Sequence, residues 1–104
     1  MIRAIMIFVC TTFSGTPAVA AACEVFEHMN LTGESMTIER NQSLPRLGKL
    51  NNRVSSVKVA PRCLMIAYAD EGYNGAITTF GPGMHATLPD EWDDRMSSLH
   101  CNCQ

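Results

Sequence analysis

Two short stretches of the chain are rich in side-chain oxygens and share one pattern. Residues 51–56 read NNRVSS and residues 93–98 read DDRMSS, so each has two adjacent Asn or Asp residues, two spacers and two serines. Carboxylate, amide and hydroxyl oxygens suit a hard cation such as calcium, which takes about six to eight of them. The same residue types also form ordinary turns, so either stretch alone is compatible with a purely structural role.

The two stretches lie 42 residues apart and belong to a longer repeat. The same offset relates five further pairs of similar residues: Phe26 and Tyr68, Leu31 and Tyr73, Gly33 and Gly75, Thr37 and Thr79, Leu50 and Trp92. A period of about 40 residues is typical of duplicated structural units. We therefore predict two copies, residues 23–60 and 63–101, within a single domain that spans residues 23–104.

Each copy has the sequence signals of β-structure. An alternating run, a β-rich run after a glycine and a closing run are typical of strands, at 23–28, 35–39 and 54–60 and again at 63–70, 76–80 and 96–101. Segments 44–50 and 88–94 each have room for one helical turn beginning at a proline. Two four-stranded units, neither able to bury its apolar face alone, predict an all-β sandwich of two sheets.

The first 22 residues have the layout of a secretory signal peptide. Arg3 gives a positive start, residues 4–13 are apolar but too short to span a bilayer, and small residues follow. Ala-x-Ala cleavage sites end at Ala20 and Ala22. The alternative is an ordinary buried helix, which the threonines, glycine and proline of residues 11–17 disfavour. We predict that the chain is secreted or periplasmic.

Export bears on the cysteines, because oxidising compartments favour disulfides. Cys10 falls in the predicted signal peptide, which leaves Cys23, Cys63, Cys101 and Cys103. We predict two disulfides, and the sequence does not choose among the three possible pairings. Free thiols and a metal site are the alternatives, although Cys101 and Cys103 are closer together than most zinc-binding pairs. A lipoprotein-like box at 20–23 would instead lipidate Cys23, but it lacks the usual large aliphatic residue.

Composition and spacing argue against several functions. The chain has 8 Lys+Arg against 10 Asp+Glu, and its net charge of −2 becomes −3 without residues 1–22. Nucleic-acid binding favours a basic stripe on the protein, so we expect no nucleic-acid partner. We also expect no membrane span outside the predicted signal peptide. The histidines stand at unrelated places in the repeat, and the motif serines have no His or Asp at a nucleophile's spacing. We predict that the protein is not an enzyme.

The repeat resembles the βγ-crystallin superfamily. Phe26-x-x-x-x-Leu31-x-Gly33 and its counterpart Tyr68-x-x-x-x-Tyr73-x-Gly75 are similar to the folded-hairpin signature of that family. NNRVSS and DDRMSS are similar to its calcium motif, Asn/Asp-Asn/Asp-x-x-Ser/Thr-Ser, and Leu50 and Trp92 stand where the family places a large apolar residue.

The resemblance covers nearly all of residues 23–101 and implies two intercalated Greek keys in one β-sandwich. Leu31 departs from the aromatic residue that the family prefers, which puts the aromatic corner of the first hairpin in doubt. The cysteines depart from the lens proteins, although small exported microbial members and a related group of secreted metalloprotease inhibitors use disulfides.

The resemblance also implies two calcium ions, each bound by both copies. The fifth motif position, Ser55 or Ser97, gives its hydroxyl to the metal, and the sixth, Ser56 or Ser98, supports the hairpin of its own copy. An Asn or Asp of one motif completes the site of the other. The candidate ligands are therefore the side chains of Asn51, Asn52, Ser55, Asp93, Asp94 and Ser97, with backbone carbonyls of Arg53, Arg95, Glu27 and Ala69 or close neighbours.

The charges predict unequal sites, because one motif is neutral in its Asn residues and the other carries two aspartates. We expect both motif arginines to point to solvent, where they do not repel the ion. The affinity expected is micromolar to sub-millimolar.

Two functions of different classes remain open. The first is a secreted, non-enzymatic calcium-binding domain that the metal stabilises. The alternative is a protein-binding inhibitor of a secreted protease or toxin, with loops 69–75 and 78–91 as its contact surface and Tyr73 and Phe80 as anchors. A structural coat or spore protein is not separated from the first by sequence.

Overall fold

The computed structural model describes residues 21–104, which form eight strands and one short 3₁₀ helix. The first copy contributes β1 (Cys23–His28), β2 (Thr32–Ile38), β3 (Ser43–Leu44), the helix η2 (Gly48–Leu50) and β4 (Ser56–Val59). The second contributes β5 (Cys63–Asp70), β6 (Asn74–Phe80), β7 (Gly83–His85) and β8 (Ser98–Cys103). The predicted signal peptide lies almost entirely in residues 1–20, outside the described residues.

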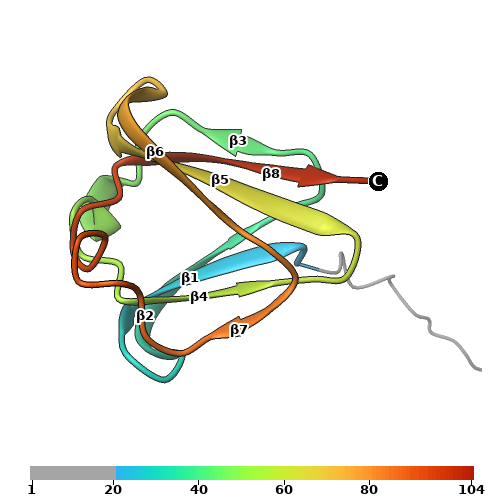
Figure 1. Ribbon diagram of the computed structural model, residues 1–104, viewed down its shortest axis with the longest axis horizontal. Coiled ribbons are helices and arrows are strands. Elements are labelled where there is room, and N and C mark those ends of the chain that lie inside the picture. Colours follow the sequence, from blue (N-terminus) through green and yellow to red (C-terminus); the bar gives the residue numbers. More distant parts are fainter. Residues whose placement is uncertain (1–20) are drawn as a thin grey trace, which may run out of the picture.

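The strands form two antiparallel four-stranded sheets, in the orders β2-β1-β4-β7 and β3-β8-β5-β6. Figure 1 shows the sheets facing each other across the interior. Each copy lends its third strand to the other sheet: β7 pairs with β4, and the two-residue β3 pairs with β8. The predicted all-β sandwich of two intercalated Greek keys is therefore confirmed.

Alternation along the strands explains why the core lies between the sheets. In β1, Cys23 and Val25 are buried and alternate with half-buried residues, and in β5 the buried residues from Cys63 to Ala67 alternate with exposed or half-buried ones. Leu50 and Trp92, the large apolar residues that precede the two motifs, are both buried. The interior also takes in the fully buried residues Ile38, Leu47, Val54, Val57, Met65, Met96 and Leu99.

The predicted helical turns differ between the copies. Segment 44–50 contains η2, but this helix begins at Gly48 rather than at the proline, and its N-cap residue is Leu47. Segment 88–94 forms consecutive turns in which the carbonyl of Pro89 accepts hydrogen bonds from the amides of Trp92 and Asp93, at 2.8 and 3.0 Å. Both turns deliver their large apolar residue to the core just before the motif begins.

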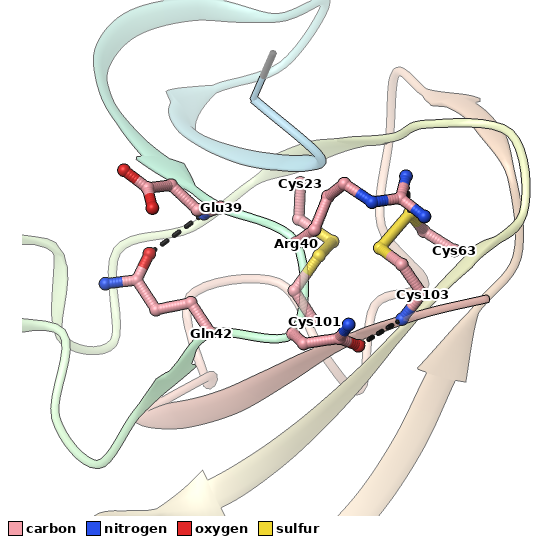
Figure 2. The surroundings of a disulfide bond; sticks show 8 residues. Cys23, Glu39, Arg40, Gln42, Cys63, Cys101 and Cys103 are labelled. Atoms are coloured by element: carbon pink, nitrogen blue, oxygen red, sulfur yellow. Dashed lines mark hydrogen bonds between the residues drawn. A yellow bond between two sulfur atoms is a disulfide. The ribbon is translucent and has the colours of Figure 1, made fainter. Parts of the chain in front are cut away.

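The two disulfides have different places in the sandwich (Figure 2). Cys23–Cys101 joins β1 of one sheet to β8 of the other, whereas Cys63–Cys103 joins the neighbouring strands β5 and β8. This pairing resolves the choice that the sequence left open, and it also removes the lipidated alternative for Cys23. The sulfur atoms of Cys63, Cys101 and Cys103 lie within 4.8 Å of one another, so the cluster consists of adjacent disulfides.

The sheet takes in one residue before the predicted boundary of the domain. Ala22 is buried, its amide donates to the Ile38 carbonyl at 2.9 Å, and its carbonyl accepts from the Ala60 amide at 2.8 Å. Ala22 thus extends the ladder of β1 by one residue. The part of the chain that the structure describes contains no helix with the length and apolar character needed to cross a bilayer.

The inter-sheet disulfide generates a prediction about stability. Replacing Cys23 and Cys101 together with alanine should lower the free energy of unfolding by about 4 kcal/mol, because cysteines 78 residues apart no longer restrict the unfolded chain. Urea denaturation of the oxidised variant, followed by the fluorescence of the buried Trp92, measures the loss. A loss below about 1 kcal/mol would contradict the role given to this bond.

Candidate metal centre

The two motifs lie side by side at one end of the sandwich. The Asn52 amide donates to the Met96 carbonyl and the Asp94 amide donates to the Val54 carbonyl, both at 3.0 Å. The second residue of each motif is therefore fixed by the backbone of the other motif. Both residues have left-handed backbones, with φ of 58° at Asn52 and 59° at Asp94, which Asn and Asp adopt more readily than most residues.

The side chains cross between the copies in the same way. The Ser55 hydroxyl donates to Oδ1 of Asp94 at 3.3 Å, and the Ser97 hydroxyl donates to Oδ1 of Asn52 at 3.0 Å. Ser55 and Ser97 are both buried. Each fifth-position serine thus meets the second-position residue of the opposite motif, and both copies supply oxygen to each cluster.

Backbone hydrogen bonds attach each cluster to its hairpin. The Ser55 amide donates to the Phe26 carbonyl and the Ser97 amide donates to the Tyr68 carbonyl, both at 2.9 Å. Glu27 and Ala69 are the next residues along those hairpins, where the ladder breaks register before His28 and Asp70. The predicted carbonyl donors therefore follow directly after the strand residues that hold the two serines.

A cavity of about 240 Å³ opens at the first cluster. Its lining consists of Glu27, His28, Arg53, Ser55 and Asp94. The Glu27 carboxylate lies 3.5 Å from the Arg53 guanidinium and 3.8 Å from Nε2 of His28. Sequence reasoning had assigned Glu27 only a backbone role, because the register break that turns its side chain toward the cavity leaves no signal in the residue types.

The motif arginines are both exposed, but they have different partners, and Arg53 lines the cavity of the first cluster instead of pointing away from it as predicted. Arg53 pairs with the Glu27 carboxylate at the edge of the cavity. Arg95 lies 5.7 Å from the Trp92 ring centroid and donates to the Glu91 carbonyl at 3.4 Å. Among the described residues, a motif arginine thus forms an ion pair only at the first cluster, where Arg53 lies beside Glu27.

The first motif position behaves differently in the two copies. Oδ1 of Asn51 is a buried side-chain oxygen without a hydrogen-bond partner among the described residues, whereas Asp93 is exposed. An unpaired buried oxygen costs free energy unless something outside the protein chain satisfies it. The Oδ1 atom of Asn51 is therefore available as a metal ligand within the first motif.

The sixth-position serines hold the folded hairpins, as predicted. Ser56 donates from its hydroxyl to the His28 carbonyl at 2.6 Å and accepts from the Leu31 amide at 3.0 Å. Ser98 makes the equivalent bonds to the Asp70 carbonyl at 2.7 Å and the Tyr73 amide at 3.0 Å. One buried hydroxyl in each copy thus closes the hairpin whose carbonyls face the motif.

The hairpin glycines make this fold of the chain possible. Gly33 has φ of +84°, and a Cβ there would lie 2.5 Å from Cδ2 of His28. Gly75 has φ of +82°, and its Cβ would lie 2.6 Å from the Asp70 carboxylate. The repeated glycine is therefore needed both for the backbone angle and for the close approach of the hairpin's own side chains.

The two hairpins differ in their aromatic contacts, because the first has Leu31 where the second has Tyr73. Tyr73 meets Tyr68 edge to face at 5.7 Å and stacks on the His100 ring at 4.2 Å between centroids. Leu31 occupies the equivalent place in the first copy and offers no ring. Only the second hairpin has this aromatic corner among the described residues.

The anchors considered for an inhibitor surface are largely occupied within the fold. Phe80 is buried and contacts the His85 ring at 5.3 Å between centroids, so it offers no anchor to a partner. Tyr73 is half-buried in its stack on His100.

No protein-family model matches the sequence. Human syncollin is 29% identical over 79 residues, and the match covers 68% of this chain. The chain spans 59% of the length of syncollin, so the comparison concerns only part of that protein.

Solved βγ-crystallin domains have the same fold. A domain from Flavobacterium johnsoniae superposes with a TM-score of 0.70 at 24% identity, covering 80% of this chain and 96% of its own. An archaeal βγ-crystallin gives 0.64 at 28% identity, with coverages of 75% and 93%. A structure that addresses the evolution of the eye-lens βγ-crystallin domain fold gives 0.72 at 28% identity, with coverages of 91% and 97%.

The hairpin serines give a prediction that does not depend on metal. Ser56→Ala should lower the free energy of unfolding by about 1–3 kcal/mol, because the Leu31 amide and the His28 carbonyl lose their shared partner. Thermal and urea denaturation in the presence of a chelator measure the loss. Ser35→Ala, on the exposed face of β2, is the control and should change stability by less than about 0.5 kcal/mol. Equal effects of the two substitutions would refute the assignment.

Proposed function

The chain is a domain of the βγ-crystallin fold, and we propose that it is an exported, non-enzymatic protein that binds two calcium ions between its paired motif loops. The observation that carries this proposal is the reciprocal contact of Ser55 with Asp94 and of Ser97 with Asn52. Hydroxyl and carboxylate or amide oxygens from both copies already meet at two places. A hard cation placed between the serine hydroxyl and the facing Asp or Asn oxygen would replace their hydrogen bond, and the side chains would need only small shifts.

The donor sets fit calcium by their chemistry. The first site would use the Ser55 hydroxyl, the Asp94 carboxylate and the carbonyls of Glu27 and Arg53. The second would use the Ser97 hydroxyl, the Asn52 amide oxygen and the carbonyls of Ala69 and Arg95. Asn51, with its buried unpaired oxygen, and Asp93 supply the first positions of the motifs. All of these are oxygen donors, which calcium prefers, and water completes such sites where protein oxygens are too few.

Electrostatics favour the first site for the tighter binding. Asp94 and Glu27 both line its cavity, and their carboxylates attract a divalent ion. Arg53 opposes this attraction, but it is mostly exposed and its pair with Glu27 is screened by water. The second site has the neutral Asn52 in place of Asp94. The aspartate-rich motif therefore strengthens the site built around the serine of the other motif.

Calcium would supply a fixed positive charge and a coordination centre, and the chain's residues determine the consequence. The donors come from both copies, so the ion would favour the state in which the copies are docked. Binding to the folded state alone stabilises it by about 2.7 kcal/mol when free calcium is a hundredfold above Kd. A secreted domain of this size gains substantially from such an addition, because its own core is small.

Export is part of the proposal, and the buried alanine favours one cleavage site. Cleavage after Ala22 would remove a residue whose amide and carbonyl are both hydrogen-bonded in the sheet. Cleavage after Ala20 would keep these bonds and leave the exposed Ala21 at the new terminus. We infer that the signal peptide is removed after Ala20.

Calorimetric titration of the oxidised protein with calcium tests the metal proposal. We expect two binding events and a higher melting temperature in calcium than in chelator. Asp94→Ala should weaken the tighter event by about tenfold or more, which corresponds to about 1.4 kcal/mol, and should leave the weaker event largely intact. Asn52→Ala should do the reverse, because Asn52 faces Ser97.

The control variant for both is Asp90→Ala, which removes an exposed carboxylate just outside the motif. Asp90→Ala should leave both events unchanged. If the unaltered protein gave neither heat nor a change in melting temperature, the motifs would serve only as turns. If Asp94→Ala and Asp90→Ala had equal effects, the cross-copy ligand assignment would be wrong.

Amino-terminal sequencing of the chain exported from a host cell tests the cleavage site. We expect the sequence to begin Ala21-Ala22-Cys23, since this terminus preserves both hydrogen bonds of Ala22. A product that begins at Cys23, or an unprocessed product, would contradict the inference.

A further inference from the structure

The end of the sandwich where β8 finishes carries a second candidate site, built around the disulfide between β5 and β8. We propose that Cys63–Cys103 is a thiol-exchange site. In this proposal an external thiolate attacks the sulfur of Cys103, and Cys63 leaves as a thiolate beside the guanidinium of Arg40. Cys23–Cys101 is closed to the external thiol and remains a structural bond.

Accessibility distinguishes the two disulfides. Cys23 and Cys101 are 1% and 0% exposed, so an external thiol has no access to either sulfur while the protein is folded. Cys63 is also buried, and Cys103 alone among these cysteines is half-buried. Cys103 is therefore the more exposed partner of this bond, and the proposal takes its sulfur as the point of attack, because thiol–disulfide exchange requires access to the sulfur that is attacked.

A cavity provides the approach to that sulfur. It has a volume of about 380 Å³ and is lined by both cysteines together with Arg62, Leu64, Pro82, Asn102 and Gln104. Leu64 and Pro82 give it an apolar wall, and Arg62 adds a positive charge. These features suit a small thiol or a cysteine-containing peptide segment, and the positive charge favours the thiolate form of either.

Arg40 is placed to stabilise the leaving group. Its Nη1 lies 4.0 Å from Sγ of Cys63, and its Nη2 donates to the main-chain carbonyl of Gln104. Figure 2 shows the guanidinium beside this disulfide, while the Glu39 carboxylate lies away from it. A neighbouring guanidinium stabilises a thiolate, and a thiol with a lower pKa leaves faster.

The loop that carries Arg40 is itself attached to β8. Asn41 accepts a hydrogen bond from the Cys103 amide at 2.8 Å, and the Gln42 carbonyl accepts from the Cys101 amide at 2.9 Å. The Glu39 amide donates to the side chain of Gln42 at 2.8 Å within the loop. Arg40 is thus held over the disulfide by bonds on both sides of it in sequence.

The fold does not depend on the exchanged bond alone. β5 and β8 are paired continuously from Cys63 with Cys103 to Tyr68 with Ser98. Cys23–Cys101 separately holds β8 to the opposite sheet. Opening Cys63–Cys103 therefore leaves both the strand ladder and the inter-sheet connection in place, so the domain can exchange this disulfide while folded.

The chemistry balances with an external thiol as the reductant. One thiolate forms a bond to the sulfur of Cys103, the Cys63–Cys103 bond breaks, and Cys63 carries away the electron pair. A second thiolate then attacks the external sulfur of the mixed disulfide and releases Cys103 as a thiolate. In total the protein disulfide gains two electrons, and two external thiols are oxidised to one disulfide.

Timed trapping with glutathione and with dithiothreitol tests the proposal on the oxidised protein. After each interval, free thiols are alkylated and mapped by mass spectrometry of peptides. We expect glutathione attached at Cys103 with Cys63 alkylated. We also expect both reagents to open Cys63–Cys103 at least about tenfold faster than Cys23–Cys101, because the second is inaccessible. Circular dichroism should show the sandwich retained.

Arg40→Gln tests the leaving-group role, with Arg46→Gln as its control in an exposed loop. Loss of the guanidinium should slow opening by about threefold, since the rate depends on the pKa of the departing thiol, whereas Arg46→Gln should have no effect. Equal rates in the two variants would overturn the role of Arg40. Glutathione on Cys63, alkylation of Cys23 in the folded protein, or opening only on unfolding would overturn the site itself.

Discussion

The structure depends on the exchange of the third strand between the two copies. β3 is only two residues long and β7 only three, yet each completes the sheet of the other copy. Neither copy forms a four-stranded sheet from its own residues, so the two must fold together. The same exchange brings the loops after η2 and before β8 to one end of the sandwich (Figure 1), where their backbones bond reciprocally.

The exchange also reverses a conclusion that the motif sequences suggest when read separately. DDRMSS carries the negative charge, but Asp94 faces Ser55 of the neutral motif. Glu27 adds its carboxylate to the same cavity from the first hairpin. The charge is therefore concentrated at the cluster whose own motif is uncharged apart from Arg53, and Ser97 is left with the neutral Asn52. A ranking of the two proposed sites from motif composition alone would be the reverse of the ranking that these contacts favour.

Much of the fold could be predicted because the repeat is visible in short sequence patterns that recur at a fixed offset. The offset of 42 residues relates Ser56 to Ser98 and Gly33 to Gly75. Each serine closes the hairpin of its own copy, and each glycine has a positive φ beside a side chain of that hairpin. The disulfide pairing could not be predicted, since Cys101 and Cys103 lie on the same face of β8 and differ only in their position along the strand. Their partners follow from the long-range register that sets Cys63 opposite Cys103. The side-chain role of Glu27 was missed for a similar reason, because a register break places it.

Strand β8 connects the two ends of the molecule at which chemistry is proposed. Its first residue, Ser98, closes the second hairpin, and its last, Cys103, forms the accessible disulfide. Between them, Cys101 is bonded to β1 in the opposite sheet and is completely buried. This bond holds the middle of the strand, so a change at Cys103 reaches the motif loops only through a segment that is paired with β3 and β5 and bonded to the opposite sheet. The separation would allow the half-buried disulfide to react as proposed while the oxygen clusters at the other end keep their geometry.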